Sequence, residues 1–218
     1  MKPIGISQKL RKLHRLELSG KINYIDNIPY YQGRRIISTN SPIDGGVCIG
    51  EKQREAIVVD SGKDKEVKKL YTLVKKFSLV NGSIKKELIL PMTFGIVSEK
   101  IEYNKEKTRK IMTHLKVSND DKVSIDTIID LGFGESSHLA LICGAILELA
   151  IKEALLHGQV NIDRNSTYNN GRTWCRYTSF IDETLILDVA EPFFGKLEDG
   201  LAKGFWCYDR PENYLGVF

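Results

Sequence analysis

The sequence predicts an α+β fold built around one buried helix, and three patterns carry this prediction. Residues 136–156 are apolar on nearly every face, which is typical of a helix that is covered on all sides. Short segments that read as strands follow at residues 160–165, 173–177 and 185–190. Residues 65–80 place apolar side chains at helical spacing, so helices and strands are both expected.

The length of the chain favours one continuous domain. Its 218 residues and mass of 24.7 kDa allow one sizeable core and leave little room for a second. We expect residues 126–218 to form this core and residues 1–125 to form an N-terminal elaboration of helices and strands. A composition of 42% hydrophobic and 28% charged residues argues against a largely disordered chain.

The positive charge of the chain does not point to a nucleic-acid partner. The net charge is +4, from 32 Lys and Arg against 28 Asp and Glu. Much of the excess lies in residues 63–76 and 105–116, where acidic residues such as Glu66 and Glu106 stand among the lysines. Such mixed runs are typical of solvated helix faces, so nucleic-acid binding is not expected.

The cysteines and the N-terminal sequence indicate in which cellular compartment the protein is expected. None of the four cysteines forms a Cys-x-x-Cys pair or has metal-ligand spacing to a histidine, so we predict no metal, no cofactor and reduced thiols. The N-terminus lacks the apolar core of a signal peptide, and no apolar run reaches membrane-spanning length. We therefore expect a protein without a membrane span that is cytoplasmic, or secreted without a cleaved N-terminal signal.

The N-terminal elaboration divides into helical and extended segments. Residues 6–18 have the leucine spacing of a short amphipathic helix. Residues 30–60 contain short β-branched stretches bounded by Gly, Pro or Asp, which predict strands and turns. The helix at residues 65–80 should stop at Asn81-Gly82, and a second helix is expected over residues 92–115.

The start of the buried helix has features of a reactive site. Gly134 permits a close backbone approach, and Glu135, Ser136 or Ser137 can cap the free N–H groups of the first turn. A helix N-terminus also lowers the pKa of a thiol, which is why thiol enzymes place their nucleophile there.

Three segments in order resemble the transglutaminase-like superfamily, which is related to the papain-like thiol hydrolases. They are Gly-Phe-Gly-Glu-Ser-Ser-His-Leu-Ala at 132–140, Gly-Arg-Thr-Trp-Cys-Arg-Tyr-Thr at 171–178 and Leu-Ile-Leu-Asp-Val-Ala at 185–190. In that superfamily a cysteine opens a buried helix, a histidine follows in a His-Ala-Trp strand, and an aspartate closes the next strand. Ser136 stands in the cysteine position, Arg172 in the histidine position and Asp188 in the aspartate position.

The resemblance covers roughly residues 126–210 and implies both a fold and a class of function. Residues 195–197 and 206–211 are similar to further parts of the same module. The implied fold is transglutaminase/papain-like, with the central buried helix packed on an antiparallel sheet. Ser136, Arg172 and Asp188 should then converge at one end of the helix.

The replaced cysteine and histidine favour a catalytically impaired protein, a pseudoenzyme. Such a protein would act by binding a protein or peptide, for example as an inhibitor, a scaffold or a bacterial effector. The alternative is an active amide-directed acyl-transfer enzyme, that is a deamidase, transglutaminase or cysteine protease, whose nucleophile is mutated or located elsewhere.

The resemblance also predicts what replaces the catalytic hydrogen bond. Asp188 interrupts an apolar run, and a buried carboxylate needs a partner. Arg172, or Arg176 on the same strand face, is the candidate cation.

Other candidate groups are assigned to structure. Ser136 is expected to cap the helix, and His138, two residues along, points to a different face and is a poor base for it. Cys143 and Cys175 are predicted to be packing residues, and Cys207 falls in the resembling segment 206–211.

A papain-like order of Cys48, His157 and Asp188 can also be drawn. The residues around Cys48 lack that family's signature, and its flanking glycines suit a hairpin. His157 is expected to interact with the C-terminus of the buried helix.

Overall fold

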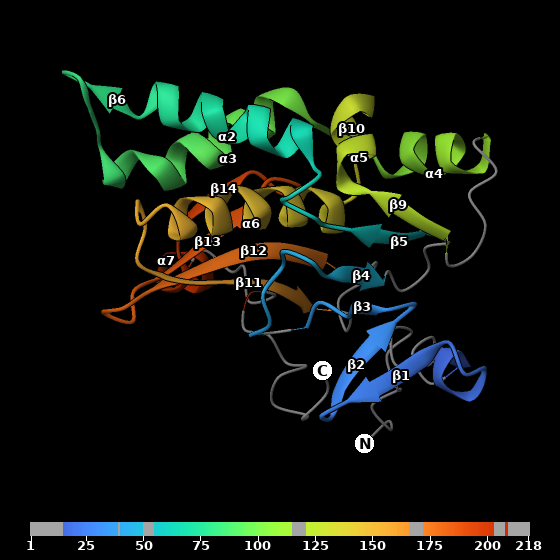
Figure 1. Ribbon diagram of the computed structural model, residues 1–218. Helices are drawn as coiled ribbons and strands as arrows, with labels where there is room; N and C mark the ends of the chain where they lie inside the picture. The colour runs from blue at the N-terminus through green and yellow to red at the C-terminus, as the bar shows by residue number, and fades with distance from the viewer. Residues whose placement is uncertain are drawn as a thin grey trace.

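Helix α6 (Ser136–Lys152) lies in the middle of three layers in the computed structural model (Figure 1). Helices α2 and α3 cover one side of it, and a four-stranded antiparallel sheet covers the other. The structure describes residues 15–38, 40–49, 55–114, 121–165, 172–202 and 208. The architecture is α+β, as the sequence predicted.

The buried helix begins where the sequence placed it and ends earlier. Most of its side chains are inaccessible to solvent, because helices pack on one side and strands on the other. Gly144 allows Ile43 and Ile162 to pack directly against the backbone of α6, since a Cβ atom at this position would collide with both side chains. The helix stops at Lys152 and not near Leu156, because Ala154 adopts a left-handed backbone conformation with φ of 57°.

The sheet that supports α6 has the order β11-β12-β13-β14 with all neighbours antiparallel. Alternate side chains of its strands face opposite sides. Cys175, Tyr177 and Leu187 join the apolar cluster around α6, whereas Trp174 and Ile186 belong to a separate cluster on the other face. The strands are β11 (Gly158–Asn165), β12 (Arg172–Ser179), β13 (Thr184–Asp188) and β14 (Phe193–Lys196).

The helix predicted at residues 92–115 is wrong as a single element. A short strand, β8 (Glu102–Tyr103), interrupts it and pairs in parallel with β10 (Phe133–Gly134). The backbone N–H groups of Glu102 and Asn104 donate to the carbonyls of Gly132 and Gly134 at 2.9 Å. This long-range pairing overrides local helical preference. The helices outside α6 are α2 (Lys65–Phe77), η1 (Lys86–Leu88), α3 (Ile89–Lys100), α4 (Lys105–His114), α5 (Ile125–Leu131) and α7 (Leu197–Ala202).

Short strands account for most of the remaining N-terminal half, as expected for residues 30–60. They form one antiparallel sheet near the N-terminus, one mixed sheet beside α5, and one hairpin after α2 (Figure 1). Of the amphipathic helix expected at residues 6–18, residues 15–18 are helical and the others lie outside the described residues. The strands are β1 (Ile22–Ile25), β2 (Ile28–Tyr31), β3 (Arg34–Arg35), β4 (Val47–Ile49), β5 (Glu55–Val58), β9 (Asp121–Ser124), β6 (Leu79–Val80) and β7 (Ser83–Ile84).

One apolar cluster unites both halves of the chain. It contains Val67 from α2, Ile125 from α5, Ile142 from α6 and Leu187 from β13. Among the described residues, none of the helices is both long and apolar enough to cross a membrane.

Candidate functional site

An ion pair joins strands β12 and β13 of the sheet that packs on the buried helix. Arg172 is the first residue of β12, and Asp188 is the last residue of β13. The guanidinium Nη2 of Arg172 lies 3.0 Å from Oδ2 of Asp188, whose side chain is only 1% exposed. The structure therefore contains the ion pair expected from the burial of Asp188.

Two further groups hold the Asp188 carboxylate. The Tyr208 hydroxyl donates to Oδ2 at 3.0 Å, and the backbone N–H of Glu191 donates to Oδ1 at 3.1 Å. Burial raises the pKa of Asp188, although the Arg172 charge and the Tyr208 hydrogen bond oppose the rise. Arg172 also lies 3.2 Å from the Glu191 carboxylate and 5.7 Å from the centre of the Tyr208 ring. The carboxylate is thus fixed by three partners from three parts of the chain.

The second candidate cation serves a different carboxylate. Nε of Arg176 lies 2.8 Å from Oδ2 of Asp163 on β11, and both side chains are largely buried. The ion pair of Asp188 is therefore with Arg172.

Ser136 starts α6 at the same end of the molecule as the Arg172–Asp188 pair. The 17 residues of α6 span about 25 Å and the 8 residues of β11 span about 26 Å, so β11 returns the chain to the level at which α6 began. Strand β12 begins and strand β13 ends at this level (Figure 1), and their terminal residues there are Arg172 and Asp188. No hydrogen bond joins Ser136 to Arg172 or Asp188, all three of which are described. Both charged side chains project on the sheet face that carries Trp174, away from α6. The structure therefore brings Arg172 and Asp188 together and places Ser136 at the same end of α6 without a hydrogen bond to either.

Tyr103 lies next to the start of α6, and the charges of the ion pair act on it. It belongs to β8, opposite Gly134, so the strand pairing brings it next to the first turn of α6. Its pKa is raised first by burial and then by the negative charges of Glu135, Asp188 and Glu191, while Arg172 lowers it. Its side chain remains 45% exposed. The charges at the helix start and at the ion pair therefore both shift the pKa of the Tyr103 phenol, which is also accessible to solvent.

The first turn of α6 is closed by backbone and side-chain contacts around Glu135. The N–H of Glu135 donates to Nδ1 of the fully buried His138 at 3.2 Å, and Nε of Arg109 lies 3.5 Å from the Glu135 carboxylate. Ser136 is the first helical residue, so the N-cap is Glu135 and the expected Ser136 cap is wrong. His138 uses a ring nitrogen to hold the turn, in agreement with its exclusion as a base for Ser136.

The described thiols do not form a thiol-hydrolase site. Cys143 and Cys175 are fully buried, and burial raises the pKa of both. Cys48 is a half-buried residue of β4. Cys207 and Gly171 of the resembling segments lie outside the described residues.

The papain-like order of Cys48, His157 and Asp188 is wrong. His157 precedes Gly158, which pairs with Ser179 at one end of β12, whereas Asp188 lies beside Trp174 near the other end. These positions are about 17 Å apart along the strand. The His157 ring instead stacks on Phe180 with centroids 6.2 Å apart.

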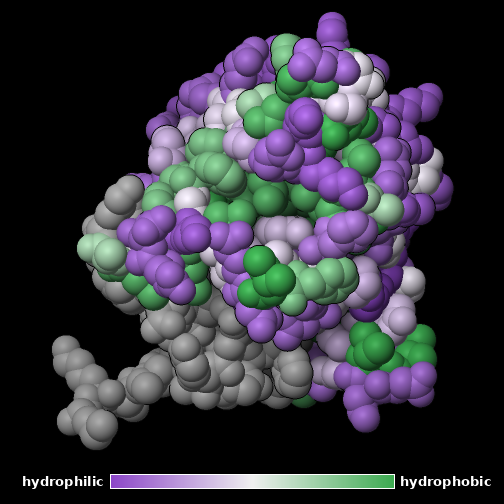
Figure 2. All heavy atoms as spheres, turned by 90° about the vertical axis from the view of Figure 1, so that its left-hand side faces the viewer, coloured by the Kyte–Doolittle hydropathy of each residue, from purple (hydrophilic) through white to green (hydrophobic). Residues whose placement is uncertain are grey.

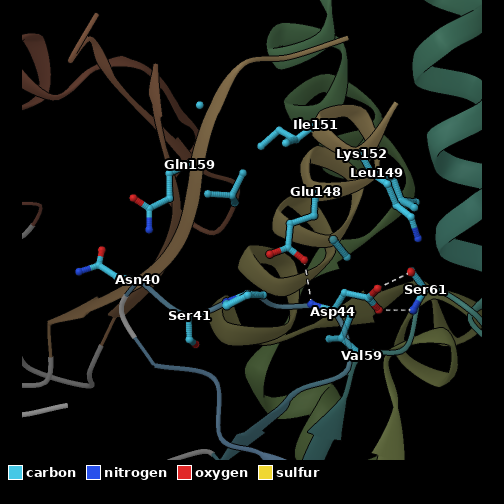
Figure 3. A pocket seen from close by; sticks show the side chains of 14 residues that line it. Asn40, Ser41, Asp44, Val59, Ser61, Glu148, Leu149, Ile151, Lys152 and Gln159 are labelled. Carbon is cyan, nitrogen blue, oxygen red and sulfur yellow. Dashed lines mark hydrogen bonds between the residues drawn. The ribbon is translucent and has the colours of Figure 1, made fainter. Parts of the chain in front are cut away.

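A cavity of about 380 Å³ lies near the opposite end of α6 (Figure 3). Ser136, Arg172 and Asp188 do not line it. Its walls are mostly apolar, and polar side chains of α6, β11 and the loop before β4 stand around them. The lining residues are Asn40, Ser41, Pro42, Asp44, Val59, Ser61, Ala145, Glu148, Leu149, Ile151, Lys152, Gly158, Gln159 and Val160.

Glu148 anchors one wall of this cavity. Its carboxylate accepts hydrogen bonds from the N–H groups of Ile43 at 2.6 Å and Asp44 at 2.7 Å, as Figure 3 shows in part. The Asp44 carboxylate in turn accepts from the N–H and hydroxyl of Ser61, both at 2.6 Å. Burial raises the pKa of Glu148 despite its two hydrogen bonds. The sequence carried a signal for this residue, because Glu148 is the one carboxylate among the residues that form α6.

No cluster of three His, Cys, Asp or Glu side chains suited to a metal ion occurs in the described part of the chain. Comparisons with protein-family models, curated proteins and solved structures give no match for this chain.

Removing the Arg172 side chain should lower the free energy of unfolding more at neutral pH than at acid pH. Arg172→Leu strands the buried Asp188 carboxylate, so we expect the free energy of unfolding at pH 7 to fall by about 3 kcal/mol. The loss should shrink as the pH falls through the raised pKa of Asp188, because a neutral carboxyl needs no cation. Urea unfolding at several pH values measures both effects.

A double-mutant cycle distinguishes the interaction energy between Arg172 and Asp188 from nonspecific destabilisation of the fold. Asp188→Ala and Arg172→Leu together should cost clearly less than the sum of the single changes. Lys110→Ala, which removes an exposed ion pair with Glu106, serves as the control and should change stability by less than about 1 kcal/mol. Additive effects of the two site variants would contradict an energetic interaction between Arg172 and Asp188.

Glu148 should give a pH dependence of stability with a definite sign. Its raised pKa means that the folded state binds its proton more tightly than the unfolded state. The contribution of Glu148 is therefore fully present below the ordinary carboxyl pKa and is lost as the pH rises through the folded pKa. The stability of the wild type relative to Glu148→Gln should decline between about pH 4 and pH 7.

Urea unfolding of both proteins across this pH range provides the measurement. Glu106→Gln is a control of opposite sign, because an ion pair with Lys110 lowers the pKa of Glu106. A wild-type advantage over Glu148→Gln that grows with pH would refute the assignment.

Proposed function

We propose that this chain is a catalytically impaired member of the transglutaminase-like superfamily that acts by binding a protein or peptide. The observation that carries the proposal is the Arg172–Asp188 ion pair, 3.0 Å long, between the two strands that would hold the histidine and aspartate. The carboxylate that would orient an imidazole instead holds a guanidinium.

The chemistry of the three positions supports loss of catalysis. A thiol hydrolase needs a thiolate and a group that transfers protons near neutral pH. Ser136 offers a hydroxyl, and the guanidinium of Arg172 does not titrate in that range. His138 is fully buried and accepts from the Glu135 N–H through Nδ1.

The exposed groups around this end support a binding role. Tyr103 is 45% exposed, and Arg109 and Glu191 expose about half of their side chains. Tyrosine and arginine contribute more binding free energy to protein interfaces than most residue types. Because Asp188 and Tyr208 fix Arg172, a peptide would meet a charged group that is already ordered, which lowers the entropic cost of binding.

The proposal predicts that the protein has no thiol-dependent acyl-transfer activity. Purified protein should release no ammonia from glutamine peptides, form no isopeptide bonds with an added amine and cleave no protein substrate. Activity that disappears when Cys48 is alkylated, and that Cys48→Ser also removes, would instead establish an active enzyme with a relocated nucleophile.

The binding role is tested with peptides selected from an unbiased displayed library. Tyr103→Ala should weaken the binding of such peptides about tenfold, the size expected for loss of an aromatic contact at the centre of an interface. Tyr24→Ala is the matched control, because Tyr24 is similarly exposed on the N-terminal sheet, and it should leave affinity unchanged. Failure to select any peptide, or equal affinity for both variants, would refute binding at this end of α6.

A further inference from the structure

Two β-turns carry exposed apolar side chains on one side of the molecule. The β6–β7 hairpin and the turn between β12 and β13 both project from the left-hand side in Figure 1. At the first, Leu79 and Val80 are 52% and 38% exposed, and Phe77 just before it is 57% exposed. At the second, Phe180 and Ile181 are 79% and 83% exposed.

Tight turns hold these side chains away from the core. Asn81 and Gly82 both have positive φ, the geometry that closes a two-residue hairpin, and β6 pairs with β7 on either side. In the second turn the N–H of Ser179 donates to the Glu183 carbonyl at 2.9 Å, and the N–H of Asp182 donates to the Ser179 carbonyl at 3.1 Å. Both tips are therefore ordered and present their apolar residues to solvent.

Lysines frame the first tip. Lys75 and Lys76 precede it in α2, and Lys85 and Lys86 follow it. Figure 2 views this side of the molecule and shows hydrophobic groups at its upper and lower parts, separated by a hollow and bordered by hydrophilic side chains. We call the two tips and these four lysines the hairpin face.

The charge around the hairpin face is positive overall. Lys152 and Lys196 add to the four lysines, against four carboxylates at Glu87, Glu153, Asp182 and Glu183. Lys75 is paired with Glu153 and Lys196 with Glu183, both at 2.9 Å, which leaves four of the six lysines without a carboxylate partner in the described part of the chain. Of these, Lys76, Lys85 and Lys86 flank the first tip, and Lys152 lies at the end of α6. The positive excess thus lies at the first tip, next to Leu79 and Val80.

We propose that the hairpin face docks this protein on the surface of an anionic lipid bilayer. Protruding apolar tips insert between lipid headgroups without needing a complementary shape, and nearby lysines are attracted to negatively charged lipids. Both tips point to the same side, so one flat surface meets them together. This inference does not depend on the proposed function, because the hairpin face lies at the other end of α6 from Ser136.

Vesicle co-sedimentation tests the proposal with the full chain. The wild type should pellet with vesicles of phosphatidylcholine and phosphatidylserine, much less with pure phosphatidylcholine, and less again at high salt. Leu79→Ser together with Val80→Ser should lower the partition coefficient about tenfold or more. Lys76→Glu together with Lys85→Glu should abolish the preference for phosphatidylserine.

The control removes apolar side chains elsewhere on the surface. Ile25→Ser together with Ile28→Ser changes two exposed residues of the N-terminal sheet and should bind vesicles like the wild type. Circular dichroism melts verify that each variant folds. In Leu79→Trp, the introduced indole should shift its emission to shorter wavelength when anionic vesicles are added.

Three results would overturn the proposal. The first is no vesicle binding by the wild type, and the second is equal loss of binding in the hairpin and control variants. The third is concentration-dependent self-association that Leu79→Ser with Val80→Ser removes in the absence of vesicle binding, which would make the face a contact between protein copies.

Discussion

The burial of α6 on all sides is the constraint on which the rest of the structure depends. A helix with apolar side chains around its whole circumference must be covered from two directions, which requires helices on one side and a sheet on the other. The buried charged side chains near α6 consequently lie toward its two ends. At its start, Arg172 and Asp188 meet on the neighbouring strands, and toward its end Glu148 binds the backbone of the loop before β4.

The two ends solve the same electrostatic problem in different ways. A buried carboxylate is costly unless hydrogen bonds or a cation compensate for the lost water. Asp188 has a guanidinium, a phenol and a backbone N–H, whereas Glu148 relies on two backbone N–H groups. Because a guanidinium stays charged, the first solution fixes Asp188 in a structural role that a titrating imidazole would not impose. The proposed loss of catalysis and the local stability of this end thus have one cause.

Local patterns predicted the parts of the fold that local physics determines. The buried helix, α2 and the need of Asp188 for a cation followed from apolar spacing and the cost of burying charge. The continuous helix over residues 92–115 failed because the parallel pairing of β8 with β10 depends on residues that are distant in the sequence. The same pairing brings Tyr103 to the site, and no local signal marks it. Tyr208 likewise reaches Asp188 through ring contacts with Trp174 and Phe193, which are distant from it in the sequence.

The most direct test of the central claim asks whether the start of α6 and the position of Arg172 are the two halves of a former thiol site. In a Cys48→Ser background, the alkylation rate of the thiol introduced by Ser136→Cys is measured against pH, alone and combined with Arg172→His. Because Arg172 and Asp188 project from the sheet face turned away from α6, an imidazole at position 172 must reach past the end of the sheet to contact the introduced thiol. If the positions correspond, this imidazole lowers the pKa of the thiol, and alkylation in the combined variant persists well below the ordinary thiol pKa of about 8.5. Identical pH profiles in the two variants would contradict the account.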